Sequence, residues 1–463
     1  MRVTAHGWWL EEAGAVEARP PLAGERRADV VILGGGYTGM WTAWHLAERG
    51  VEVALLESGV CGEGPSGRNG GFVDHLAHAA PRLREIAGDD AARATIAASI
   101  ESVERIGKWC TDQRVDAWFH RGGQIVASAA PAQDGSQDEA VAACEALGLA
   151  DELRPLSAAE VAARCASPML RGGAFARSTA TVQPARLARG LRARLLDRGV
   201  QIFERSRVTA LRGTVAETGA GRVHAGAAVL AIGGRAIAAK PLRRRLTMTS
   251  SHLVITEPMP GLLERLGWTG GEAITDSRHL VHYFRTTPGG RIAFGWGGGR
   301  IVCGARLQPR DDADRNLALQ VARDLSLFFP DDLSRQIRPG RVVHAWGGPI
   351  DASPQHLPIV DTLPGGRAHV AFGYTGNGVG PSELCGRILA RMALDERDEL
   401  TRLPIVGQGG PLLPPEPLRV AGGAAIRAAL ERKESAEEAG RAPSGLARAV
   451  ASLPHLLGVE IGR

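Results

Sequence analysis

Cysteine is scarce in this sequence and never closely spaced. The six cysteines of the 463-residue chain form no CxxC pair, so neither a zinc site nor a dithiol centre is indicated, and no metal is expected. The N-terminus MRVTAHGWWL lacks the apolar stretch of a signal peptide, and no run approaches the ~20 apolar residues of a membrane span. These absences predict a protein of a reducing compartment, the cytoplasm, with no membrane span.

Concentrated basic charge is also lacking. The net charge is +5 and the pI is near 9.1, but the arginines are spread along the chain, and 243–245 is the only basic triplet. No basic stripe alternates with aromatic residues, the pattern typical of nucleic-acid surfaces. We therefore expect no nucleic-acid partner.

Glycine, in contrast, is abundant, with 60 residues, several of them in short clusters. The first cluster follows the apolar run Val30–Leu33, which is typical of a buried parallel strand. A helical pattern follows and ends at Gly50, and a second strand, Val51–Leu56, completes a βαβ unit.

The first cluster has the spacing Gly34-x-Gly36-x-x-Gly39 of a dinucleotide-binding loop. The first glycine permits a tight turn, the second lets the backbone approach a pyrophosphate, and the third lets helix and strand pack closely. The N–H groups at the start of the helix would face the phosphates. Glu57, at the end of the second strand, can accept hydrogen bonds from ribose hydroxyls and would repel the 2′-phosphate of NADP.

This loop alone does not distinguish FAD from NAD, but two further glycine clusters favour FAD. Residues 62–72 (GEGPSGRNGGF) follow the second strand, where a flavin enzyme must line the pyrophosphate and the ring with close backbone. Residues 373–380 (GYTGNGVG) precede a helix, whose positive end suits the flavin carbonyl O2 and stabilises negative charge on the reduced ring. The three clusters together predict one extended FAD site.

Three strings of sequence resemble the D-amino-acid oxidase-like FAD oxidoreductases. They are ADVVILGGGYTGMWTAWHLAERGVEVALLES, GPSGRNGGF and AFGYTGNGVGPSELCGRILA. Within that family the chain is most similar to the γ-glutamylputrescine oxidase type, in the branch that includes glycine and sarcosine oxidases. Supporting segments are VQPARL at 182–187, AIGG at 231–234, HYFR at 282–285 and WGG at 346–348.

The resemblance implies an α/β fold with α+β character, like that of glutathione reductase and D-amino-acid oxidase. A Rossmann-type FAD-binding domain would be joined to a substrate domain built on an antiparallel sheet. A polar lead-in would precede them, with Trp8 and Trp9 docked on the body of the protein. The expected segments are the lead-in at 1–27, the FAD-binding domain at 28–76, 160–240 and 343–404, the substrate domain at 77–159 and 241–342, and a C-terminal helical extension at 405–463.

The resemblance also places individual residues at the cofactor. Val208 would meet the adenine through its backbone, and the loop around Arg68 would lie beside the flavin; the alternative for Arg68 is a cation that stabilises its own loop. The expected FAD-binding residues are Gly34, Gly36, Tyr37, Thr38, Gly39, Glu57, Ser58, Gly64, Ser66, Gly67, Arg68, Asn69, Gly70, Gly71, Val208, Ala231, Gly233, Gly348, Gly373, Gly376, Asn377, Gly378, Val379 and Gly380.

Departures from the family pattern bear on the chemistry. Some relatives attach FAD through a Cys or a His, and the corresponding stretches 345–348 and 66–68 contain neither, so noncovalent FAD is expected. Members that oxidise amino acids hold the substrate carboxylate with arginines, where this chain has Ile350 and Gly376, and a buried carboxylate without a cation is costly. The alternative is that Arg285 supplies the missing cation from another strand. The oxygen-activating Lys of the sarcosine oxidase type corresponds to Ala293, which leaves the acceptor open between O2 and an electron carrier.

The expected reaction is hydride transfer to flavin N5 from the carbon beside a neutral amine nitrogen, followed by imine hydrolysis to an aldehyde and an amine. The substrate would be an amine or an N-substituted amine, either polyamine-like or an N-alkyl amino compound. Aromatic side chains can hold an amine and lower its pKa by desolvation. The expected catalytic residues are Tyr283, Trp346, Tyr374 and Arg285, and the expected pocket residues are His252, His282 and Phe284.

Each of these side chains could instead belong to packed structure, and two other functions stay open. The first is a D-amino-acid or opine dehydrogenase that passes electrons to a carrier. The second is a flavoprotein subunit without turnover of its own.

Overall fold

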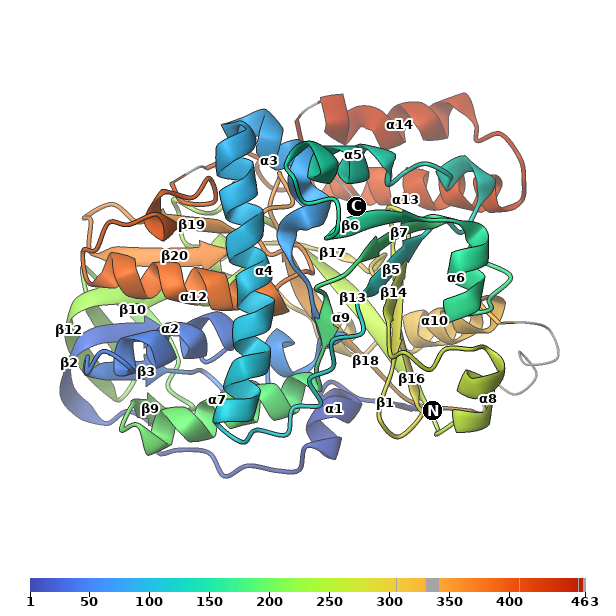
Figure 1. Cartoon of the computed structure of the whole chain (residues 1–463). Coiled ribbons are helices and arrows are strands. Elements are labelled where there is room, and N and C mark those ends of the chain that lie inside the picture. Colours follow the sequence, from blue (N-terminus) through green and yellow to red (C-terminus); the bar gives the residue numbers. More distant parts are fainter. Residues whose placement is uncertain (305, 330–340, 408, 457, 461–463) are drawn as a thin grey trace.

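The computed structural model describes residues 1–304, 306–329, 341–407, 409–456 and 458–460. Two large β-sheets lie beside each other, and helices cover the outer face of each (Figure 1). The expected fold class, a Rossmann-type α/β part joined to a second sheet, is confirmed.

The first sheet carries the βαβ unit. Its strand order is β10-β11-β12-β2-β3-β9, with β20 paired to β12 and β19 paired to β20. The pairs β12–β2, β2–β3, β3–β9 and β12–β20 are parallel, and the apolar ends of β2, β3 and β12 are buried on both faces, as parallel strands require. The strands are β2 (Gly24–Leu33), β3 (Val53–Leu56), β9 (Gln201–Phe203), β10 (Val208–Arg212), β11 (Val215–Thr218), β12 (Gly221–Leu230), β19 (Ile359–Thr362) and β20 (Ala368–Phe372).

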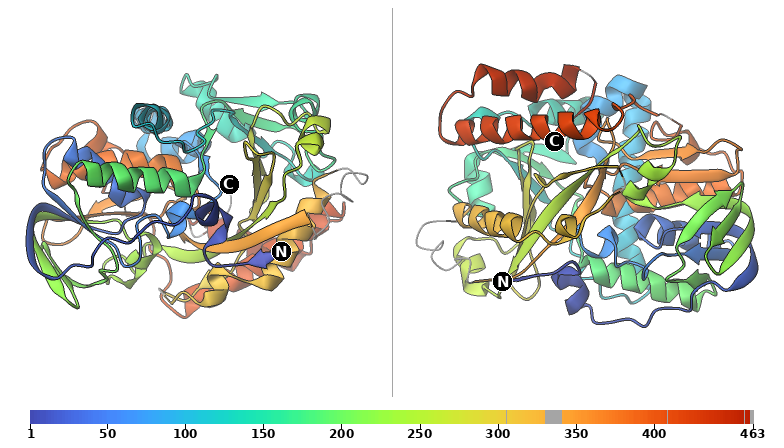
Figure 2. Two further views of the ribbon diagram at one scale, coloured as in Figure 1. Left: turned by 90° about the horizontal axis from the view of Figure 1, so that it is seen from below. Right: turned by 180° about the vertical axis from the view of Figure 1, so that it is seen from behind.

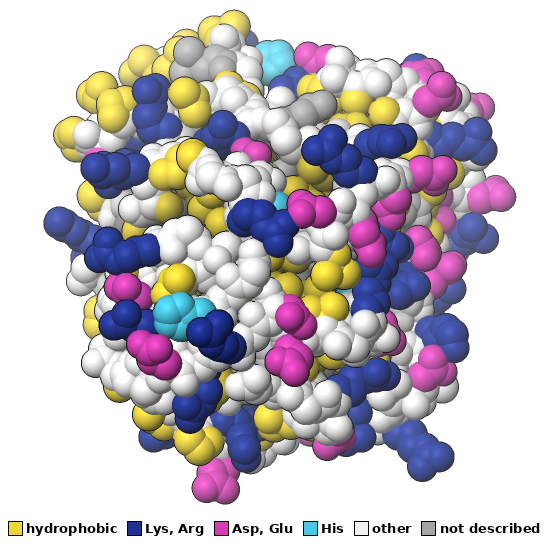
Figure 3. All heavy atoms as spheres, turned by 90° about the vertical axis from the view of Figure 1, so that its left-hand side faces the viewer, with side chains coloured by type: hydrophobic (Ala, Val, Ile, Leu, Met, Phe, Trp, Pro, Cys, Tyr) yellow, Lys and Arg dark blue, Asp and Glu magenta, His cyan; other side chains and the backbone are white. Residues whose placement is uncertain are grey.

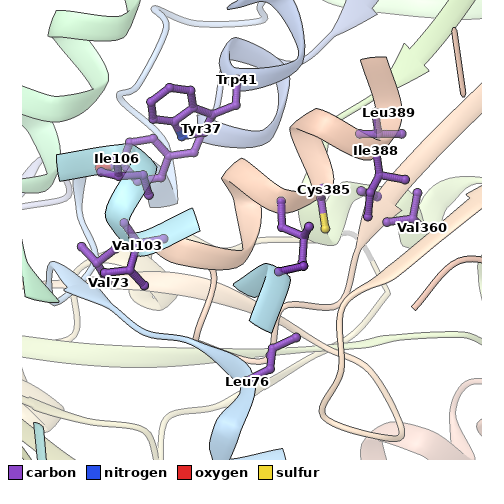
Figure 4. Packing of buried hydrophobic residues seen from close by; sticks show 14 of the residues in the cluster. Tyr37, Trp41, Val73, Leu76, Val103, Ile106, Val360, Cys385, Ile388 and Leu389 are labelled. Carbon is purple, nitrogen blue, oxygen red and sulfur yellow. The ribbon is translucent and has the colours of Figure 1, made fainter. Parts of the chain in front are cut away.

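The helices α2 (Tyr37–Ala47), α4 (Asp89–Asp112) and α12 (Val379–Ala393) pack together against this sheet. Figure 4 shows buried side chains from all three in one cluster, among them Trp41 and Ile388. A Cβ at Gly386 of α12 would lie 2.7 Å from the Cβ of Trp41, so glycine is needed for α12 to approach α2 this closely. Further helices here are α3 (Ala80–Ala87), α5 (Asp138–Ala146) and α7 (Pro184–Asp197).

The second sheet has the order β1-β18-β13-β16-β15-β14-β5-β7-β6, with β17 paired to β13. It is mainly antiparallel, and β1–β18 and β14–β5 are its parallel pairs among the described residues. The strands are β1 (Arg2–Val3), β5 (Gln124–Ala127), β6 (Leu153–Leu156), β7 (Gly173–Ala176), β13 (Thr247–Thr256), β14 (Ala273–Asp276), β15 (His282–Thr286), β16 (Ile292–Trp296), β17 (Ile301–Val302) and β18 (Val342–Ala352). A short pair, β4 (Phe72–Val73) and β8 (Ala180–Thr181), forms a third sheet.

An aromatic cluster closes the outer face of the second sheet. Phe284 and Phe294 stack at 5.3 Å, and Phe328, which follows α10 (Arg315–Leu327), packs on both rings. The remaining helices on this side are α6 (Ala158–Arg164), α8 (Pro260–Arg265) and α9 (Pro309–Asp312).

The N-terminal segment is more ordered than an extended lead-in. It contributes β1 to the second sheet and forms α1 (Gly7–Glu12). Trp9 is fully buried and contacts Trp346 edge-on at 6.1 Å. This contact is the docking on the body of the protein that was expected for Trp8 and Trp9. Burial of the Trp9 indole and the pairing of β1 with β18 both stabilise the segment against the body of the protein.

Sheet membership divides the chain differently from the expected segments. β7 and β18 belong to the second sheet, although both were assigned by sequence to FAD-binding segments. The C-terminal extension forms two helices, α13 (Leu418–Glu438) and α14 (Gly445–Leu456), drawn in red across one end of the molecule (Figures 1 and 2). Assignment of the segments to two functional domains stays a prediction.

Within the described ranges, none of the helices combines the length and the apolar character needed to cross a membrane. Likewise, no cluster of three or more metal-ligand side chains occurs in the part of the chain that the structure describes. On the face shown in Figure 3, Lys and Arg side chains are interspersed with Asp and Glu.

Candidate active site

The first glycine loop, between β2 and α2, packs so closely that only glycine fits at two of its positions. A Cβ at Gly34, where φ is +108°, would lie 2.3 Å from the carbonyl oxygen of Ala231. A Cβ at Gly39 would lie 2.0 Å from the carbonyl oxygen of Gly34. Gly36 is the N-cap of α2 and has no side chain to cap the helix N-terminus, the end of a helix that attracts an anion.

Glu57 is fixed against this loop. Its carboxylate accepts hydrogen bonds from the N–H groups of Gly35 (2.8 Å) and Gly59 (2.7 Å) and from the Ser58 hydroxyl (3.0 Å). It therefore stands at the end of β3, where an acidic residue can also meet a ribose.

The second cluster is hydrogen-bonded to the first. The Ser66 hydroxyl accepts from the N–H of Tyr37 at 2.9 Å, while the Tyr37 hydroxyl donates to the carbonyl of Pro184 at 2.7 Å. Asn69 shapes its own loop by accepting from the N–H of Gly71 at 2.7 Å and donating to the Ser66 carbonyl at 2.9 Å. Tyr37 and Asn69 thus hold the loops in place with their side chains.

The Arg68 guanidinium has hydrogen-bond partners within the protein. Its guanidinium donates to Asp312 at 2.8 Å and to the carbonyl of Ala5 at 2.6 Å, and the indole of Trp346 donates to the Arg68 carbonyl at 2.7 Å. These bonds tie the second cluster to β18 and to the N-terminal segment, which matches the alternative of a loop-stabilising cation.

The third cluster joins β18, α2 and α12. The N–H of Gly373 donates to the Asp351 carboxylate at 2.6 Å, and the hydroxyls of Tyr374 and Thr38 are 2.7 Å apart. Burial raises the pKa of Asp351 to about 6, against the lowering effect of hydrogen bonds from backbone N–H groups, the first from Gly373. Gly378 is the N-cap of α12, again without a side-chain cap.

These features fit an FAD. The N-cap residues of α2 and α12 are glycines that supply no side-chain cap, and at α2 the Ser66 hydroxyl accepts from the first N–H. The two helices follow the clusters expected at the pyrophosphate and at the flavin carbonyl O2. Space is free beside the backbone at the ring end: a Cβ at Gly348 would meet nothing within 4 Å, and one at Gly376 would meet only the tip of Ile350 at 4.0 Å. Gly233 (φ +50°) lies beside Asp351, and Val208 begins β10 at the edge of the first sheet.

A cavity of about 1650 Å³ opens beside these residues. The structure brings to its wall the part of the expected site that would face the flavin ring and the substrate. Those residues are Arg68, Asn69, Gly70, Tyr283, Gly348, Gly376, Asn377 and Val379.

Strand alternation decides which side chains of β13 and β15 reach this cavity. Thr249, Ser251 and Leu253 line it, whereas His252 lies on the opposite face, 3.3 Å from the Ser250 hydroxyl. Burial lowers the pKa of His252. His252 is therefore packed structure in this fold.

The same alternation separates Tyr283 from its neighbours in β15. Tyr283 lines the cavity, while Phe284 and His282 face the aromatic cluster with Phe328. Burial disfavours the charge of His282, but the Asp276 carboxylate at 2.9 Å raises its pKa overall. The structure does not bring His282 and Phe284 to the cavity wall.

Trp346, Tyr374 and Arg285 support the site from behind. Trp346 is 1% exposed and packs on the backbone of Gly7. Arg285 is 2% exposed and donates to the carbonyls of Val182 and Gly71, and its burial lowers its pKa to about 9. These three side chains do not line the cavity; they pack behind the residues that do.

Ser251 and Phe72 line the cavity beside Tyr283, although the sequence patterns did not single them out. The hydroxyls of Tyr283 and Ser251 are 2.6 Å apart, and Ser251 also donates to the carbonyl of Trp296 at 2.9 Å, so Tyr283 donates to Ser251. Phe72 meets the Tyr283 ring edge-on at 5.8 Å. No local signal in the sequence marked Ser251 or Asp351.

Comparison with known proteins agrees with this geometry. The model of the FAD dependent oxidoreductase family (DAO) matches residues 29–392, well over half of the chain. The probable oxidoreductase OrdL of Rhizobium meliloti (strain 1021) is 28% identical over 391 residues, covering 83% of this chain and 87% of that protein. The γ-glutamylputrescine oxidoreductase of Escherichia coli (strain K12) is 29% identical over 371 residues, covering 79% and 83%.

Among solved structures, glycine oxidase from Geobacillus kaustophilus is similar in fold. Its TM-score is 0.67 at 19% sequence identity, and the match covers 83% of this chain and 99% of that one. At this identity the likeness concerns the fold.

Proposed function

The chain belongs to the FAD dependent oxidoreductase family, and from this premise we propose that it oxidises the C–N bond of an amine or an N-substituted amine. The product would be an imine, which hydrolyses to an aldehyde and an amine. The E. coli relative whose name refers to γ-glutamylputrescine supports an amine substrate.

The observation that carries this proposal is the aromatic wall that Tyr283 and Phe72 form beside Gly70. The Tyr283 ring lies against Gly70, where a Cβ would be 3.0 Å from it, and Phe72 packs on its edge. Aromatic rings suit an amine, because they attract a cation and also desolvate it toward the neutral form.

An α-amino-acid substrate receives less support from the same wall. Ile350 and Gly376 line the cavity at the two positions where amino-acid-oxidising relatives would have arginines. Arg68 is paired with Asp312, and Arg285 is bound to backbone carbonyls, so neither guanidinium is free for a substrate carboxylate. An amine without a carboxylate avoids the cost of an unpaired buried charge.

Each wall residue has a role in this chemistry. Bound FAD would supply the hydride acceptor. Tyr283 would orient the substrate, and its hydrogen bond to Ser251 fixes the ring. The N–H groups at the start of α12 would stabilise negative charge at the flavin carbonyl O2.

The FAD is proposed to be noncovalent, because the stretches 345–348 and 66–68, where some relatives attach the cofactor, contain neither Cys nor His. Release of all flavin on acid precipitation of the protein is the expected result. Flavin that stays with the precipitate would contradict it.

The test of the function is an anaerobic screen of amines, polyamines and α-amino acids for bleaching of the flavin absorbance. Amines or N-substituted amines should bleach it. Bleaching by α-amino acids alone would replace the proposal with an amino-acid dehydrogenase. Oxygen uptake with peroxide release then decides between O2 and an electron carrier as acceptor.

A further inference from the structure

The cavity has a roof that lies outside the family match. That match ends at residue 392, whereas α13 and α14 follow it and contribute residues to the cavity wall. On α13, the lining residues Arg419, Gly422, Ile426, Leu430 and Lys433 recur every three or four positions, so one helix face looks onto the cavity.

Polar contacts fix the roof to the second sheet. The Glu434 carboxylate accepts from the N–H of His279 at 2.7 Å, and Glu438 accepts from the Arg278 guanidinium at 2.6 Å. Arg427 donates to the carbonyl of Gly298 at 2.7 Å. Because His279 and Gly298 also line the cavity, these bonds hold α13 directly at its edge.

The surface that the roof presents is largely apolar, and its polar exceptions are basic groups and the α14 residues Ser452 and His455. Ile426, Leu430, Val450 and Leu453 line the cavity. The charged side chains that the two helices add to the described wall are Arg419, Arg427, Lys433 and Arg448.

Three of those basic groups already have partners: Arg419 pairs with Glu416 (2.5 Å), Arg427 with Glu431 (2.7 Å) and Lys433 with Glu437 (2.8 Å). No carboxylate of α13 or α14 is among the described lining residues, and Glu460, which follows α14 at the wall, lies 3.5 Å from Arg82. A second ammonium group of a polyamine would therefore be desolvated at the roof without an ionic partner from these helices, whereas an uncharged chain would bury apolar surface.

The volume agrees with a long ligand. Ordinary small-molecule pockets measure roughly 300–1,000 Å³. At about 1650 Å³ the cavity exceeds that range, so it has room for a flavin ring and an extended substrate.

Accepting the proposed amine oxidation, we infer that α13 and α14 form a specificity roof that selects amines with a long uncharged alkyl substituent. Polyamines would bind less well than N-alkyl amines of equal length.

Gly422→Leu tests the inference in the FAD-loaded protein. A Cβ at Gly422 would meet nothing within 4 Å, so the added side chain enters the cavity instead of the protein core. The probes are alkyltrimethylammonium ions from butyl to decyl, which lack the lone pair needed for oxidation and are titrated by their perturbation of the flavin absorbance. The same chain lengths are assayed for turnover as N-methylalkylamines.

The native protein should bind each longer ion up to about fourfold more tightly per methylene. Gly422→Leu should weaken the decyl ion about tenfold and change the butyl ion less than about twofold. Ala424→Leu is the matched control, since Ala424 is an exposed residue of α13 that does not line the cavity, and it should keep the native length dependence.

The two proposals can fail separately. If affinity rises with alkyl chain length in the native protein but not in Gly422→Leu, and no amine bleaches the flavin, the specificity roof is supported and amine oxidation is rejected. Bleaching by amines without length dependence, or tighter binding of diamines than of alkyl chains of equal length, would reject the roof alone.

Discussion

Two groups of glycines divide the site. The closed glycines, Gly34, Gly39 and Gly380, have no room for a Cβ, which would lie 2.0 to 2.3 Å from a backbone oxygen. The open glycines, Gly348, Gly376 and Gly422, have no atom closer than 4.0 Å to that position, and all three line the cavity. Closed glycines are therefore demanded by the packing of the chain on itself, and open glycines mark space that the protein leaves for ligands.

Gly39→Ala should have the largest effect. Its Cβ would collide with the Gly34 carbonyl, which must move and pull the loop from α2. We expect loss of bound FAD and destabilisation of about 3 kcal/mol. Flavin content after purification and thermal unfolding measure both, with Gly219→Ala in the open turn before β12 as the control. If Gly39→Ala retained the native flavin content, the site would have room for a Cβ and Gly39 would not belong to the closed glycines.

Gly348→Leu should leave the fold intact and block the ligand. Nothing lies within 4 Å of the added Cβ, so the melting temperature of the FAD-free protein should match that of Gly219→Leu. FAD affinity should fall about 10- to 100-fold, because the side chain takes up ligand space. A melting temperature as low as that of Gly39→Ala would place Gly348 with the closed glycines.

The Asp351 carboxylate accepts a hydrogen bond from the N–H of Gly373, and its contribution to the stability of the fold depends on pH. Because its folded pKa is raised from 3.8 to about 6, its stabilising contribution is present below about pH 4 and is lost as the pH rises through 6. Asp351→Asn keeps an acceptor for Gly373 but does not titrate. From pH 4 to 7 the variant should gain on the order of 2 kcal/mol in unfolding free energy relative to the native protein. Parallel denaturation curves at both pH values would contradict this.

Tyr283→Phe should have the smallest effect. The ring remains against Gly70, but the hydroxyl bond to Ser251 is lost, at a cost of about 1 kcal/mol in stability. We expect a decrease in kcat/KM of about tenfold or less with the fold unchanged, measured by steady-state kinetics and thermal unfolding. A larger loss, in kcat alone, would assign the hydroxyl a direct part in the reaction.

Sequence patterns predicted the local parts of the site well. The spacing of Gly34, Gly36 and Gly39 between an apolar strand and a helix is a local feature, and the structure has β2, α2 and β3 where it indicates them. The helix expected after residues 373–380 is also present, as α12.

Side-chain direction was less predictable. His252, His282 and Phe284 stand one position away from Ser251 and Tyr283, and a one-residue step in a strand moves a side chain to the other face. Composition offers no means to choose between those faces. Only the pairing of β13 with β16 and β18 sets which face meets the cavity.

The sequence alone therefore determined the family, the cofactor class and the three glycine clusters, because each depends on residues within a few positions of one another. Only the tertiary structure decided that Arg68 bonds to Asp312, that Asp351 holds Gly373, and that α13 and α14 wall the cavity. These contacts join residues 22 to 244 positions apart or whole separate helices, and they exist only once both sheets have packed.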